Sequence, residues 1–243
     1  WFRPRRCRGL DIAAGETIAI VGPSGGGKTT LVNLLLRFYD RDGGTINLGG
    51  IDIEAMPRQT LRSRIAAVLQ QPFLFSRSIR ENIQLSAPAA DQAMIETATI
   101  DACIHESIQR FDAGYDTKVG ERGVTLSGGQ RQRVAIAQAL LQDPDVLILD
   151  DALSAVDTGT EQSILEAIRD RRGKHTTLII AHRLSTLKEA DRIIVLTEGV
   201  ISQQGTHQSL RDAPGLYRRL WEIQAAVEND ENDALPNDSG GTP

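Results

Sequence analysis

The 243-residue sequence predicts an α/β fold built around a mainly parallel β-sheet. Short, almost wholly apolar runs at 17–21, 145–150 and 176–181 are typical of strands that are buried on both faces. A glycine-rich loop joins the first run to a helical pattern, and another helical pattern over 160–171 separates the later runs. Strands that alternate with helices in this way favour a parallel sheet.

The remaining elements follow from the same periodicities. In chain order they are a helix over 28–38, a polar hairpin-like stretch over 43–50, a strand at 64–69, helices between about 79 and 111, a helix over 130–141 and a strand at 192–196. Asp143 and Pro144 end the helix over 130–141, because proline cannot continue a helix.

Length and composition limit the classes of protein to consider. A chain of this length buries one sizeable core, or one core with a smaller inserted subdomain. The net charge of −5 argues against a nucleic-acid partner. The segment 226–243 is acidic, lacks Lys and Arg, and is expected to be a disordered tail. Cys7 and Cys103 lie far apart in no ligand spacing, as expected of two reduced thiols.

No apolar run reaches the roughly 20 residues that a membrane-spanning helix needs. The sequence begins with Trp1 rather than Met, so we expect a fragment of a longer protein. Any membrane-spanning part would then lie upstream or on another chain.

The glycine-rich loop fits the phosphate-binding pattern G-x-x-x-x-G-K-[ST] without a mismatch. Glycines let successive backbone N–H groups turn toward phosphate oxygens, and the helix that follows directs its positive end at the same anion. Lys28 would supply charge to the β- and γ-phosphates of a nucleotide, and the Thr29 hydroxyl would bind Mg²⁺. The alternative, a chance glycine turn, is disfavoured by the buried strand before the loop and the helix after it. The expected nucleotide-binding residues are Gly22, Pro23, Ser24, Gly25, Gly26, Gly27, Lys28, Thr29 and Thr30.

Two acids follow the apolar run at 146–149. Asp150 closes this strand and is placed to hold Mg²⁺, and Asp151 would orient or deprotonate the attacking water. Taken alone, the pair is more simply an acidic turn after a strand. The phosphate-binding pattern upstream favours the catalytic interpretation.

The segment 126–130 reads Leu-Ser-Gly-Gly-Gln, and with it the order of motifs resembles the ABC ATPases. In that family this signature, here with Ser127, Gly128, Gly129 and Gln130, closes on the γ-phosphate held by the opposite subunit. A Ser and two glycines before a helix make a physical cradle for an anion.

The resemblance implies roles for three further residues. Gln70 is at the position of the Q-loop glutamine, which touches Mg²⁺ and the attacking water and senses the membrane domain. Asp157 ends a segment at 154–157 that resembles the D-loop, with Val156 as a mild departure. His182 follows the strand at 176–181, where the family has a switch histidine that contacts the γ-phosphate.

The resemblance extends to the exporter type through the segments 72–75, 78–83 and 119–123. It implies a P-loop NTPase core with an added antiparallel β segment and a helical subdomain inserted at about 72–140, all within a nucleotide-binding domain at 1–225. It also implies ATP and Mg²⁺ as cofactors and a second ABC ATPase domain, from the same or a different chain. A transmembrane domain would contact the Q-loop and the segment from Gly120 to Arg122, at the cytoplasmic face of a membrane.

Two positions depart from the family pattern. Asp151 stands where the family normally has Glu, so the carboxylate loses about 1.5 Å of reach and hydrolysis at this site should be slower. The chain would then be the slowed half of a heterodimer, although a homodimer with a weaker base stays open. Trp1 is a candidate for the adenine-stacking aromatic residue, unless that residue is missing from this fragment.

Two other functions fit parts of the pattern. An ATP-gated dimerisation module that scarcely hydrolyses ATP is favoured by Asp151. A soluble ABC ATPase of repair or translation is disfavoured by the exporter-like segments at 75–83 and 119–123.

Overall fold

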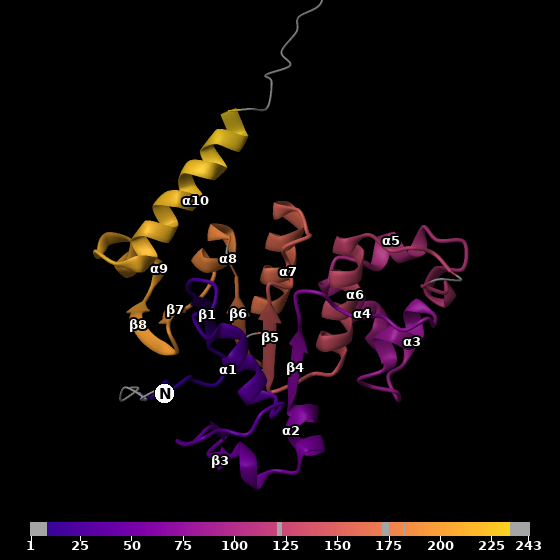
Figure 1. Ribbon diagram of the computed structural model, residues 1–243. Coiled ribbons are helices and arrows are strands. Elements are labelled where there is room, and N and C mark those ends of the chain that lie inside the picture. Colours follow the sequence, from indigo (N-terminus) through magenta and orange to yellow (C-terminus); the bar gives the residue numbers. More distant parts are fainter. Residues whose placement is uncertain (1–8, 121–122, 172–174, 182, 234–243) are drawn as a thin grey trace, which may run out of the picture.

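The computed structural model describes residues 9–120, 123–171, 175–181 and 183–233. A six-stranded sheet with the order β4-β5-β6-β1-β7-β8 forms its centre (Figure 1). The strands are β1 (Thr17–Val21), β4 (Ile65–Val68), β5 (Val146–Asp150), β6 (Thr176–Ile180), β7 (Arg192–Thr197) and β8 (Val200–Gly205). All neighbours pair in parallel except β7 and β8, which are antiparallel. The predicted α/β class with a mainly parallel sheet is confirmed.

A short antiparallel pair, β2 (Asn47–Leu48) and β3 (Ile51–Asp52), forms a second sheet close to the hairpin-like stretch expected from the sequence. The helices are α1 (Lys28–Leu35), α2 (Arg58–Arg64), α3 (Ile79–Gln84), α4 (Gln92–Asp101), α5 (His105–Gln109), α6 (Gly128–Leu141), α7 (Thr158–Asp170), α8 (Leu184–Lys188), α9 (His207–Asp212) and α10 (Leu216–Asp233), with 3-10 turns at Ile53–Ala55 and Gly114–Asp116. Among the described residues, no helix is long and apolar enough to cross a membrane.

The helices between β4 and β5 gather at the β4 edge of the sheet, as Figure 1 shows for α3 to α6. They share one hydrophobic cluster with that edge: Val68 and Leu149 of the strands pack with Ile83, Ile95 and Ile136 of the helices. Burying these apolar side chains together is the main free-energy gain that attaches the helical segment to the sheet.

Helix α1 ends earlier than the sequence pattern predicts, at Leu35 rather than near 38. Arg37 adopts the left-handed conformation with φ of 50°. Its guanidinium Nη1 donates hydrogen bonds to the carbonyl oxygens of Ile53 and Met56, at 3.0 and 2.7 Å. The left-handed turn at Arg37 ends the helix, with the Phe38 amide donating to the Asn33 carbonyl oxygen at 2.9 Å. The long-range contacts of the Arg37 side chain, which the local pattern does not reveal, hold this turn against 53–56.

Helix α10 differs from our expectation that the chain is structureless from 226 onward, because it continues to Asp233. Its first half is anchored by Tyr217, Trp221 and Ala225, which pack on the cluster formed around β7. Once a helix is nucleated by such packing, each further residue adds a hydrogen bond at little entropic cost. An acidic composition alone therefore does not end it.

Tyr217 anchors α10 with a side chain that is almost completely buried. Its hydroxyl lies 2.7 Å from Nδ1 of His207 in α9. Burial raises the pKa of Tyr217 to about 12, and burial also lowers the pKa of His207.

The free energy of unfolding should consequently fall at alkaline pH, because the buried Tyr217 hydroxyl loses its proton more easily in the unfolded chain. Because its folded-state pKa lies above the ordinary value of 10.0, the stabilisation is complete below pH 10.0 and is lost as pH rises toward about 12. We expect Tyr217→Phe to reduce this alkaline loss in urea-unfolding measurements across that range. Tyr39→Phe, at a hydrophobic residue that is 64% exposed, is the control and should follow the unchanged protein. If the free energy of unfolding falls equally with pH in all three proteins, Tyr217 is not the group responsible for the alkaline loss.

Candidate nucleotide-binding site

The phosphate loop (22–29) connects the end of β1 to α1 and is pressed against β7 and the turn after it. Gly22 and Gly27 have φ of 152° and 100°, and a Cβ at Gly22 would lie 2.0 Å from the Leu196 carbonyl oxygen. The Gly199 amide donates to the Gly26 carbonyl oxygen at 2.9 Å. Only glycine fits this backbone path, since a larger residue would clash with a neighbouring strand.

Lys28 is the cation of this loop, and only 8% of it is exposed. Its ammonium group donates to the carbonyl oxygens of Gly22 and Pro23, at 2.7 and 3.0 Å. Burial lowers the pKa of Lys28, while the nearby charge of Asp150 raises it. Thr29 and Thr30 follow in the first turn of α1, with exposed side chains. A buried cation at a helix N-terminus is suited to bind an anion.

Residues from neighbouring parallel strands meet at one edge of the sheet. Asp150 ends β5 and pairs in register with Ile180 of β6. Asp151 has φ of 51°, a conformation that Asp tolerates better than most residues, and its amide donates to the Ile180 carbonyl oxygen at 2.8 Å. Gln70 follows β4, and its Nε2 donates to Oδ2 of Asp151 at 2.9 Å. The structure thus brings Gln70 and Asp151 into direct contact.

The signature segment (126–130) leads into α6. Ser127 and Gln130 form a capping box, in which each side chain accepts from the other residue's amide, at 3.2 and 2.9 Å. A Cβ at Gly129 would lie 2.6 Å from the Ala155 carbonyl oxygen, so the segment packs closely on the D-loop (154–157). In the described part of the chain, no hydrogen bond joins residues 127–130 to the phosphate loop.

Asp157 of the D-loop caps α7 by accepting from the Thr160 amide at 3.0 Å. This backbone hydrogen bond lowers the pKa of Asp157. The Asp157 carboxylate therefore caps α7, in addition to the nucleotide-binding role that the sequence suggested.

Sequence reasoning missed two residues beside the site, Arg183 and Gln132. The Arg183 guanidinium donates to the carbonyl oxygens of Ser154 and Val156, at 2.9 and 2.7 Å, and pairs with the fully buried Glu161 at 2.7 Å. Gln132 directly continues the signature segment, but no role was assigned to it, and Arg183 belongs to no ligand-binding pattern. Of the predicted site residues, Trp1 and His182 lie outside the described residues, as do positions 121 and 122 of the expected membrane-domain contact.

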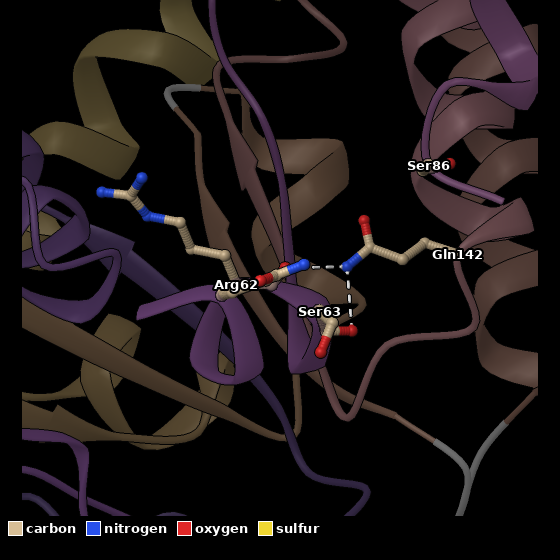
Figure 2. A pocket seen from close by; sticks show the side chains of 5 residues that line it. Arg62, Ser63, Ser86 and Gln142 are labelled. Atoms are coloured by element: carbon tan, nitrogen blue, oxygen red, sulfur yellow. Dashed lines mark hydrogen bonds between the residues drawn. The ribbon is translucent and has the colours of Figure 1, made fainter. Parts of the chain in front are cut away.

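Two cavities flank α6 on the side of the Q-loop and α2. One, of about 560 Å³, is lined by Gln59, Arg62, Ser63, Ser86 and Gln142 (Figure 2). Gln142 donates there to the carbonyl oxygens of Arg62 and Ser63, both at 3.0 Å. The other, of about 240 Å³, is lined in part by Leu69, Phe73 and Ala135. Because Phe73 is 76% exposed and Leu69 43% exposed, this side of the molecule presents apolar surface.

A family model described as ABC transporter matches residues 8–154. The chain belongs to the ABC transporter family. It is 49% identical over 215 residues to the "Uncharacterized ABC transporter ATP-binding protein YwjA" of Bacillus subtilis (strain 168), covering 88% of this chain and 37% of that protein. It is 42% identical over 227 residues to human "ATP-binding cassette sub-family B member 6", covering 93% of this chain and 27% of that protein.

Among solved structures, the "Structure of a bacterial Atm1-family ABC exporter with ATP bound" superposes with a TM-score of 0.85 and 45% identity, over 89% of this chain and 38% of that one. The chain therefore spans less than two fifths of the length of these ABC transporter relatives. The chain thus aligns with one part of an ABC exporter of known structure, in agreement with the resemblance seen in the sequence.

The phosphate loop of this ABC domain should not tolerate a side chain at Gly22. We expect Gly22→Ala to weaken ATP binding roughly tenfold or more and to destabilise the fold by about 1–3 kcal/mol, because the new Cβ clashes with β7 backbone. Nucleotide titration and urea unfolding measure the two effects. Gly43→Ala is the matched control, because a Cβ at Gly43 meets nothing within 4 Å. Unimpaired ATP binding by Gly22→Ala would show that the loop does not hold the phosphates as described.

Proposed function

We propose that this chain binds and hydrolyses ATP, with Mg²⁺, to power export across a membrane. The observation that carries the proposal is Lys28, a nearly buried cation that is held inside a glycine loop by two carbonyl oxygens. A nucleotide phosphate would take the place of those carbonyl contacts and pair with the ammonium group. The glycine positions support the fit, since the loop backbone leaves space for no side chain at Gly22.

Three oxygen donors would hold Mg²⁺: the Thr29 hydroxyl, the Asp150 carboxylate and the Gln70 side-chain carbonyl. Hydroxyl, carboxylate and amide oxygens are the ligands that this hard cation prefers. The ion would neutralise charge on the phosphates. Asp151 would accept a proton from the attacking water, and Gln70, which already donates to Asp151, would orient that carboxylate. His182 is assigned to the γ-phosphate, and Trp1 to stacking on adenine.

A second ABC ATPase domain would complete each site. Residues 127–130 lie at the start of α6, on a helix that packs in a different hydrophobic cluster from α1. Their cradle is therefore assigned to the nucleotide of a partner domain, with Ser127, Gly128, Gly129, Gln130 and the D-loop residue Asp157 facing it.

A transmembrane domain would dock beside the Q-loop. The exposed apolar side chains of Leu69 and Phe73 and the cavities along α6 support this location. The segment from Gly120 to Arg122 is proposed to contribute to the same contact. The chain would then lie at the cytoplasmic face of a membrane. In this arrangement Gln70 would lie between the membrane domain and Asp151. A movement at the ATP site would then reach the membrane domain through Gln70.

Hydrolysis at this chain's own site is proposed to be slow. Asp151 has a shorter stem than the usual Glu, so its carboxylate reaches less far toward the attacking water. General-base catalysis depends steeply on the distance to the water. The chain would then be the slowed half of a heterodimer. The same observation favours the second candidate, an ATP-gated dimerisation module with little turnover.

Steady-state Mg-ATP hydrolysis by this chain, by Asp151→Glu and by Lys28→Ala tests these proposals. We expect low turnover for the unchanged chain, a rise of about tenfold for Asp151→Glu because the base regains its reach, and loss of turnover for Lys28→Ala. Fast hydrolysis that Asp151→Glu does not raise would overturn the slowed site. Turnover that does not depend on Lys28 would overturn the proposed ATPase function itself.

A further inference from the structure

Gln132 is a nearly buried amide in α6, with only 3% of the residue exposed. Its side chain reaches three segments that are far apart in the sequence. Its Nε2 lies 3.2 Å from the Ser154 hydroxyl, 3.4 Å from the Gln70 carbonyl oxygen and 3.5 Å from the Asp151 carbonyl oxygen. Its Oε1 accepts a hydrogen bond from the Ala155 amide at 3.0 Å.

These contacts use both ends of the amide. The two long contacts are near the upper limit for a hydrogen bond, so the shorter bonds to Ser154 and Ala155 are the stronger ones. The Ser154 hydroxyl in turn donates to the Asp151 carbonyl oxygen at 2.8 Å, which closes the network around Asp151. Because an unpaired polar group costs free energy when buried, the amide and its partners hold one another in place.

Arg183 also binds the D-loop, by donating hydrogen bonds to the carbonyl oxygens of Ser154 and Val156. Gln132 differs from Arg183 because it also contacts the backbone of Gln70 and Asp151. It also lies in the helix that begins at the signature segment. One side chain therefore joins the signature helix, the Q-loop, the end of β5 and the D-loop.

We propose that Gln132 is a positioning residue, which sets the placement of Gln70, Asp151 and the D-loop relative to one another and to the signature helix. A shift of α6, when its N-terminal cradle engages a partner's nucleotide, would pass through Gln132 to this chain's own hydrolytic residues. The inference rests on the proposed function of Gln70 and Asp151 in ATP hydrolysis. The hydrogen-bond partners that the structure describes for the Gln132 side chain are all groups of this chain, so the role assigned to it is positioning.

Gln132→Met tests this, because methionine has a similar length but offers no comparable donor or acceptor. We expect kcat for Mg-ATP to fall about tenfold while KM changes less than about twofold, since geometry rather than nucleotide affinity is disturbed. Gln162→Met, on the exposed face of α7, is the control and should leave both constants unchanged. An unchanged kcat, or a fall that only follows the unfolded fraction in thermal melting, would overturn the proposal.

Hydrogen–deuterium exchange without nucleotide supplies a readout that does not depend on turnover. We expect faster exchange of the Ala155 amide and of the segment after β4 in Gln132→Met, with the amides of β1 unchanged. Uniformly faster exchange, or faster exchange at the Ala155 amide alone, would show that Gln132 has only a local packing role. Either result would overturn the proposal that Gln132 joins the D-loop to the segment after β4. If the unchanged chain shows no Lys28-dependent ATPase activity, the proposed function fails, and exchange still decides whether Gln132 joins these segments.

Discussion

The parallel register of β4, β5, β6 and β1 is the constraint on which the site depends. Parallel strands present their carboxyl ends at one edge of a sheet, and loops from that edge converge there. Asp150 ends β5 and Asp151 follows it, Gln70 follows β4, and the phosphate loop follows β1. Side chains distant in the sequence therefore come within reach of one another. The Gln70–Asp151 hydrogen bond is a direct result of this register.

Buried polar groups are the second determinant, because each one needs its partners in fixed positions. Lys28 is held by loop carbonyl oxygens, Glu161 pairs with Arg183, and Gln132 binds the D-loop. Breaking one such pair leaves its partner unsatisfied in a low-dielectric interior, which costs more than the pair contributes when intact. Hydrogen bonds of this kind join Gln70, Asp151 and the D-loop to α6. In the role proposed for Gln132, this network would pass small displacements of α6 to Gln70 and Asp151.

Much of the fold could be predicted because the buried strands carry strong local patterns. The apolar runs that became β1, β5, β6 and β7 needed no tertiary information, and the phosphate loop was evident from its glycine spacing. The end of α1, the edge strand β8 and the length of α10 could not be predicted. Arg37 reaches carbonyl groups more than a helical turn away, and α10 is anchored by packing on β7, so these features depend on contacts that the local sequence does not contain.

The sequence alone determined which chemistry the site contains, since the identity of Lys28, Asp150, Asp151 and Gln70 and the spacing of their motifs are local properties of the chain. It also determined the family, through the signature segment at 126–130. Only the tertiary structure decided which of these groups touch. Gln70 binds Asp151, and Gln132 and Arg183 form hydrogen bonds with the D-loop. Each of these contacts joins segments that are tens of residues apart in the sequence. The physical reason is that sheet register and side-chain burial arise from the whole core and cannot be read from any one segment.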